Sequence, residues 1–153
     1  MMTTMNEVMT AITTAFPGIP ILPVIGNNDV QYHNNAPNAT DAPSYYNDLW
    51  NIFVEMTPIN KQTWTDPQIS TSFHTGGYYA FDLDHDVTVF SLNGMYPFDE
   101  NSNSREPAAA MITWVGEQMA LRPNKKFIMQ YHVWAGCNFF YGLECFWVQP
   151  YLD

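Results

Sequence analysis

Positively charged residues are scarce in this sequence. Lysine and arginine together number 5 against 15 aspartates and glutamates, so the formal net charge is -10. This balance argues against binding of nucleic acid or any other polyanion by a basic surface. An anionic substrate would need metal ions to receive it.

Long apolar runs are also lacking. No stretch approaches the roughly 20 consecutive apolar residues that a membrane helix requires, and the run 19–25 is interrupted by Pro20 and Pro23. No transmembrane segment is therefore predicted. The first 16 residues have no basic start followed by a long apolar block, so no signal peptide is visible. Either the chain is cytosolic or its true start is missing.

Only two cysteines occur, and they lie close together. Cys137 and Cys145 flank an aromatic segment that is expected to be a loop, which suits either a local disulfide or two free buried thiols. Asn38-Ala39-Thr40 is an acceptor sequence for N-glycosylation, placed in a polar loop where Asn38 is expected to be exposed. A disulfide, if formed, and a glycosylation site would both fit a secreted or lumenal protein.

The first half of the sequence predicts two helices, a buried strand and a long loop. Apolar residues recur at helical spacing from Thr4 to Ala15. The apolar run 19–25 contains β-branched residues and predicts a buried strand, followed by an asparagine- and proline-rich loop at 27–43. A second amphipathic helix is expected from Ser44 to about Met56, whereas 61–71 shows no period and is expected to be irregular.

The second half predicts three strands and one helix. Residues 76–83 and 87–94 suit a hairpin with the acidic turn Asp84-His85-Asp86. A helix opens near Pro107 and continues to Arg122, and a third strand covers 125–132. Helices and strands alternate, which predicts a single α/β sandwich over 1–153, with a mixed sheet flanked by helices.

Two polar residues stand at the ends of predicted strands. Asn27 follows the run 19–25, and His132 closes the last strand. Ligands gather at such strand ends in α/β folds, and an amide oxygen and an imidazole nitrogen can share a divalent cation. Taken alone, the pattern is more typical of a turn asparagine and a core histidine, because zinc sites usually have at least three protein ligands.

Around these residues the sequence resembles the calcineurin-like metallophosphoesterases, and more closely their branch of acid sphingomyelinase-like phosphodiesterases and endopolyphosphatases. Residues 21–29 are similar to the strand and Gly-Asn-His-Asp or Gly-Asn-Asn-Asp motif of that branch. Residues 73–79 and 89–93 resemble its Gly-Gly-Tyr-Tyr strand pair and its Leu-Asn-Thr ending, with Gly94 in place of the threonine. His132–Gly136 resembles its His-Ile-Pro-Pro-Gly loop, with both prolines replaced.

The resemblance implies a metal-dependent phosphoester or phosphoanhydride hydrolase. It implies that Asn27 and His132 bind one ion of a pair of divalent ions, either zinc or iron and manganese, and that a metal-bridging hydroxide attacks phosphorus. The substrate would be a phosphate-containing small molecule or polyphosphate. The resemblance also implies a secreted, lysosomal or vacuolar location.

Position 28 departs from many members of the family, which have a histidine there that protonates the leaving oxygen. Asn28 cannot supply a proton near neutral pH, and a leaving alkoxide needs one far more than a leaving phosphate does. This favours phosphoanhydrides as substrates. His33, in the same loop, could replace the acid, although a solvated loop histidine is the more ordinary interpretation.

Several motifs of the family are missing. The Asp-x-His and Gly-Asp motifs that precede Gly-Asn-His-Asp, and the Gly-His-x-His motif that follows the His-Ile-Pro-Pro-Gly loop, do not occur here. The chain is therefore expected to be a partial metallophosphoesterase domain that is inactive alone. Two alternatives stay open: a non-catalytic binding or assembly subunit derived from this fold, and a domain completed by a partner chain.

Overall fold

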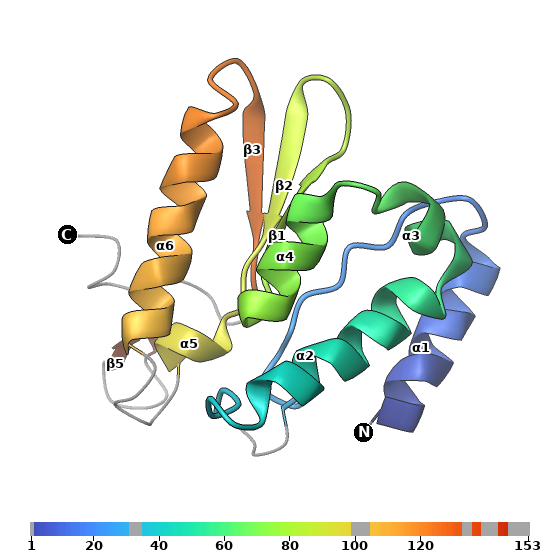
Figure 1. Ribbon diagram of the computed structural model, residues 1–153, viewed down its shortest axis with the longest axis horizontal. Helices are drawn as coiled ribbons and strands as arrows, with labels where there is room; N and C mark the ends of the chain where they lie inside the picture. Colours follow the sequence, from blue (N-terminus) through green and yellow to red (C-terminus); the bar gives the residue numbers. More distant parts are fainter. Residues whose placement is uncertain (1, 31–34, 99–104, 133–135, 139–143, 147–153) are drawn as a thin grey trace.

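The computed structural model describes residues 2–30, 35–98, 105–132, 136–138 and 144–146 of the chain (Figure 1). Its elements follow in the order α1 (Met2–Ala15), α2 (Ala42–Trp50), a π-helical turn η1 (Asn51–Glu55), α3 (Pro58–Thr63), α4 (Pro67–Gly76), β1 (Tyr79–Asp82), β2 (Val87–Ser91), α5 (Met95–Phe98), α6 (Arg105–Ala120), β3 (Lys126–Gln130), β4 (Gly136–Asn138) and β5 (Glu144–Phe146). No described helix is long and apolar enough to cross a bilayer.

The central sheet has mixed direction, in the order β1-β2-β3. β1 and β2 form the predicted antiparallel hairpin, and β3 lies parallel to β2 with Ser91 opposite Gln130. The expected α/β architecture with a mixed sheet flanked by helices is confirmed. In Figure 1, α6 lies on one side of the strands and helices α1 to α3 lie on the other.

Alternation along β1 divides the apolar interior into two clusters. Tyr79 and Phe81 belong to a cluster with α1, α2, η1 and α4, whereas Tyr78 and Ala80 belong to a cluster with α6. Successive strand residues point to opposite faces, so the two clusters lie on the two faces of the sheet. α6 contributes Ala108, Met111 and Val115 to the second cluster. These residues recur at helical spacing, and all three are buried.

The predicted strand at 19–25 is wrong. No ladder forms there, because Pro20 and Pro23 have no backbone donor. Polar side chains satisfy the backbone instead: Asn60 accepts from Ile21 N through Oδ1 and donates to Ile21 O through Nδ2, at 2.9 and 2.8 Å. Tyr79 Oη and Ser91 Oγ both donate to Pro23 O, and Gln130 Nε2 donates to Leu22 O.

The prediction of irregular structure at 61–71 is also wrong, because α4 begins at Pro67. Asp66 caps this helix by accepting from Gln68 N at 2.9 Å, and Pro67 occupies its first turn. The helix ends at Gly76, and the next residue, Gly77, has a left-handed φ of 70°. A Cβ on Gly77 would lie 2.4 Å from Ile25 Cδ1, so glycine permits both the turn and the close approach.

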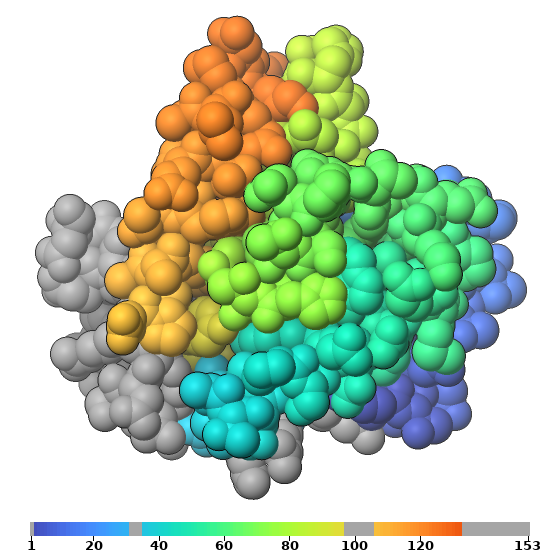
Figure 2. All heavy atoms as spheres, in the orientation of Figure 1, coloured from blue at the N-terminus to red at the C-terminus, as the bar shows by residue number. Residues whose placement is uncertain are grey.

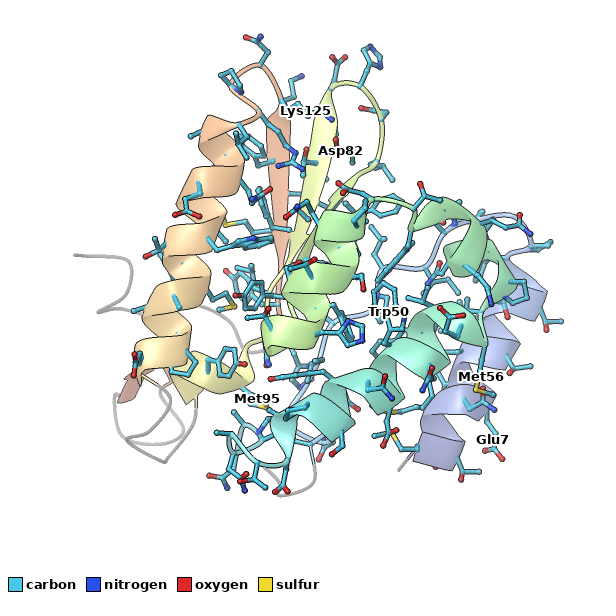
Figure 3. All side chains as sticks on the ribbon, viewed as in Figure 1. Glu7, Trp50, Met56, Asp82, Met95 and Lys125 are labelled. Atoms are coloured by element: carbon cyan, nitrogen blue, oxygen red, sulfur yellow. The ribbon has the colours of Figure 1, made fainter. Side chains whose placement is uncertain are left out.

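One end of the sheet projects from the molecule. Figure 2 shows the turn between β1 and β2 and the turn between α6 and β3 standing out side by side. There Lys125 Nζ lies 2.7 Å from an oxygen of Asp82, and Figure 3 labels both residues at this end. The carboxyl ends of β2 and β3 lie at the opposite end of the sheet, near α5.

The strand β3 is at the edge of the described sheet. Ile128 is 50% exposed and Met129 is 40% exposed, although these neighbours point to opposite faces. β4 and β5 form a separate antiparallel pair in which Cys137 and Cys145 stand opposite each other, where a loop was expected. Directly opposed residues of antiparallel strands have the Cα separation that a disulfide requires, and the disulfide stays a prediction.

We expect Asn60→Ala to destabilise the fold by about 2–4 kcal/mol, because it leaves the partly buried N–H and carbonyl of Ile21 and the buried carbonyl of Phe53 without their partner. Urea denaturation measures the change. Asn47→Ala, at an exposed position of α2, is the matched control and should alter stability by no more than about 0.5 kcal/mol. Equal effects of the two substitutions would contradict this account of residues 21–23.

Candidate functional site

The candidate site lies where the extended segment 19–25 ends in a tight turn. Asp29 N donates to Gly26 O at 3.0 Å, so Gly26–Asp29 forms a β-turn with Asn27 and Asn28 at its centre. Asp29 also closes the turn from its side chain, because its Oδ2 accepts from Gly26 N at 2.9 Å. This double closure fixes the backbone on both sides of Asn27.

The second component follows β3. His132 comes two residues after the end of the strand, and its Nε2 lies 3.0 Å from Asn27 Oδ1. The structure thus brings together residues that are 105 positions apart in the sequence. Asn28 Nδ2 also approaches Asn27 Oδ1, at 3.3 Å. Because Oδ1 is an acceptor, this contact is a hydrogen bond when His132 Nε2 carries a proton to donate.

Glycine at position 26 allows His132 to take this position. A Cβ on Gly26 would lie 2.9 Å from both Cδ2 and Cγ of His132, so the imidazole ring lies against the backbone at Gly26. The pairing of Asn27 with His132 therefore depends on the residue before Asn27 having no side chain.

The separation of 3.0 Å suits two ligands of one cation. Amide oxygen and imidazole nitrogen bind divalent ions at about 2.1 Å, so two ligands at the right angle of octahedral coordination are about 3.0 Å apart, against about 3.4 Å at the tetrahedral angle usual for zinc. Binding at Nε2 would require the proton to move to Nδ1, because the metal takes the lone pair that the neutral Nε2–H form lacks. The pair consequently has the geometry of two adjacent ligands.

A two-metal centre needs more ligands than Asn27 and His132. Within the described residues, no three His, Cys, Asp or Glu side chains gather closely enough to hold an ion. Asn27 and His132 therefore fit as a ligand pair, whereas the described part of the chain does not fit the two-ion centre that the family resemblance implies. No hydrolytic step through two ions follows from these residues.

The remaining candidate residues are placed as follows. Asn28 is exposed at the tip of the turn, and Asn38 is exposed in the segment before α2. Asn38 Oδ1 accepts from Thr40 N, the backbone of the last residue of its glycosylation sequence. His33 lies outside the described residues. His74 packs against Trp50, and His85 is exposed in the turn between β1 and β2.

One residue beside the turn carries no sequence signal. Tyr45 is buried in α2, and its Oη donates to Asp29 O at 2.8 Å. Tyr45 and Asn28 also line a hollow of about 520 Å³ together with Asp41 and Asp48. A hydrogen bond to a backbone carbonyl places no demand on the residue type at position 29, so no motif records it.

Two known proteins that are similar to this chain are endopolyphosphatases, one of the groups that the sequence resembles. The chain is 27% identical over 139 residues to an endopolyphosphatase of Neurospora crassa, and 30% identical over 105 residues to an endopolyphosphatase of Kluyveromyces lactis. These matches cover 84% and 64% of this chain but only 18% and 14% of the two relatives. No family model matches the chain.

We expect Gly26→Ala to separate Asn27 from His132, because the new methyl group would overlap the imidazole ring. The NMR signals of the His132 ring report the change. Gly116→Ala is the control, since a Cβ there meets nothing within 4 Å; it should leave those signals unchanged and stabilise α6 by about 0.5–1 kcal/mol. Unaltered His132 signals in Gly26→Ala would contradict the predicted steric effect.

Proposed function

We propose that this chain contributes Asn27 and His132, as one pair of metal ligands, to a hydrolase that cleaves phosphoanhydride bonds in polyphosphate. The observation that carries the proposal is the 3.0 Å approach of Asn27 Oδ1 to His132 Nε2 across 105 residues. The two endopolyphosphatases with which the chain aligns support the substrate class. The other groups of the centre come from outside the described residues.

Charge supports a need for cations at such a site. The chain has a net charge of -10, and Asp41 and Asp48 line the hollow beside Asn28. Polyphosphate would be repelled from these carboxylates without positive charge to receive it. Bound divalent ions supply that charge and lower the pKa of a coordinated water.

Asn28 supports the choice of an anhydride over an ester. Its amide cannot protonate a leaving oxygen, and it is exposed at the tip of the turn. A leaving phosphate is already stable as an anion, so its departure needs little acid assistance. In this proposal Asn28 orients Asn27 through their 3.3 Å contact and carries no proton.

A non-catalytic role is the second candidate, favoured by the absence, among the described residues, of any group of three His, Cys, Asp or Glu side chains that could hold an ion. Such a chain would retain the sheet for binding or assembly. The two functions differ in one outcome, the shortening of long-chain polyphosphate resolved on a gel. Metal-dependent shortening that is lost in His132→Ala supports the hydrolase, whereas stoichiometric binding without turnover in any assembly supports the second role.

We expect the chain to bind Mn²⁺ at Asn27 and His132, with paramagnetic broadening of NMR signals centred on these residues. Asn27→Ala and His132→Ala should each weaken this binding about tenfold or more, because each removes a ligand. His85→Ala is the control, because it removes an exposed histidine at the turn between β1 and β2. Broadening centred on the acidic residues of that turn, and unchanged in His132→Ala, would contradict a site at Asn27.

In a preparation that shortens polyphosphate, we expect Asn28→His to raise cleavage of a phosphodiester with an alkoxide leaving group by about 10²-fold or more, through restored acid catalysis. Polyphosphate cleavage should change by less than about threefold, since its leaving group needs little protonation. Initial rates on the two substrates give the comparison. Equal acceleration of both would show that the residue at position 28 does not select the leaving group.

A further inference from the structure

Besides its contact with His132 and its connection to the segment held at residues 21–23, the turn that carries Asn27 is joined to α2 by a hydrogen bond. The two hydrogen bonds within the turn, from Asp29 N to Gly26 O and from Gly26 N to Asp29 Oδ2, fix its shape. They do not fix its position relative to the helices around it. The hydrogen bond from Tyr45 Oη to Asp29 O, at 2.8 Å, joins the turn to α2. This bond spans 16 residues, so it links two elements that are otherwise separated by a long loop.

Packing on the outer side of the turn is sparse. Asn28 is exposed, and the hollow of about 520 Å³ lies between Asn28 and the wall formed by Val30, Tyr45, Asp41 and Asp48. A turn bordered by open space is not held by van der Waals contact on that side. The Tyr45 hydroxyl therefore holds the turn toward α2 on this side, together with the buried side chain of Val30.

Tyr45 itself is firmly placed. It is only 7% exposed, and its ring packs edge-on against Tyr46 with the centroids 5.2 Å apart. Burial is the largest cause that raises the pKa of Tyr45, and the negative charge of Asp29 raises it further. The hydroxyl therefore stays protonated and can donate. A fixed donor on a buried helix can define the position of the carbonyl that it binds.

We propose that Tyr45 is a positioning residue for the candidate site, and that its hydrogen bond to the carbonyl of Asp29 holds the turn where Asn27 Oδ1 meets His132 Nε2. The importance of this role for metal binding rests on the proposed function, whereas the positioning itself does not. Release of the carbonyl would let the turn move toward the hollow. Asn27 would then withdraw from His132.

The test compares Tyr45→Phe with Tyr46→Phe in the full chain. Each removes one buried hydroxyl from neighbouring positions of α2, but the Tyr46 hydroxyl bonds to Tyr96 Oη at 2.8 Å and to Asn93 Nδ2 at 3.2 Å, and no described bond joins it to the turn. Both variants should lower the urea midpoint. Only Tyr45→Phe should shift the NMR signals of the His132 ring and of the Asn27 side-chain amide, and weaken Mn²⁺ binding about tenfold, as loss of an orienting partner does.

The outcomes separate positioning from a structural effect. Unchanged His132 and Asn27 signals in Tyr45→Phe, or equal shifts in Tyr46→Phe, would overturn the proposal. Shifted signals in Tyr45→Phe alone, in a chain that binds no Mn²⁺, would support positioning and count against the proposed function. Should Tyr45→Phe fail to fold, hydrogen exchange of the Tyr45 hydroxyl is measured by NMR in the unsubstituted chain. A hydroxyl proton that is protected from exchange and close to Asp29 supports the hydrogen bond. A freely exchanging proton overturns the proposal.

Discussion

The extended segment 21–24 is the constraint on which the rest of the structure depends. Its backbone is held by polar side chains from four different elements: Asn60 from α3, Tyr79 from β1, Ser91 from β2 and Gln130 from β3. These bonds replace a strand ladder that Pro20 and Pro23 cannot form. They fix the point at which Gly26 enters its turn, and with it the position of Asn27 relative to the end of β3.

A second polar network joins the two apolar clusters at the same end of the sheet. Asn93 follows β2 and is fully buried; its Nδ2 donates to Gly76 O and to Tyr46 Oη, and its Oδ1 accepts from Met95 N. Tyr46 belongs to the cluster on one face, and the Tyr96 hydroxyl that it contacts belongs to the other. A satisfied buried network of this kind fixes one relative arrangement of its elements. The strand ends therefore form a rigid base beneath the candidate site.

The sequence predicted the elements that have a clear period, namely the hairpin, α1, α6 and β3. It failed at 19–25, where apolar composition indicated a strand but the prolines removed the donors, and at α4, whose start was marked by Asp66-Pro67 and not by a long period. The proximity of Asn27 and His132 could be anticipated, because both follow apolar segments that were predicted as buried strands, and ligand-binding residues gather at such strand ends. Tyr45 could not be found, since its partner is a backbone carbonyl.

The open edge of β3 has a consequence for what surrounds His132. Ile128 and Met129 leave apolar surface exposed on both faces, and no other described strand pairs with the outer side of β3, where an edge strand can accept a further strand. A strand added there, in either direction, would have one of its ends beside His132, because β3 itself ends at Gln130. Side chains at that end would lie close to His132, so extension of the sheet would change the surroundings of the candidate site.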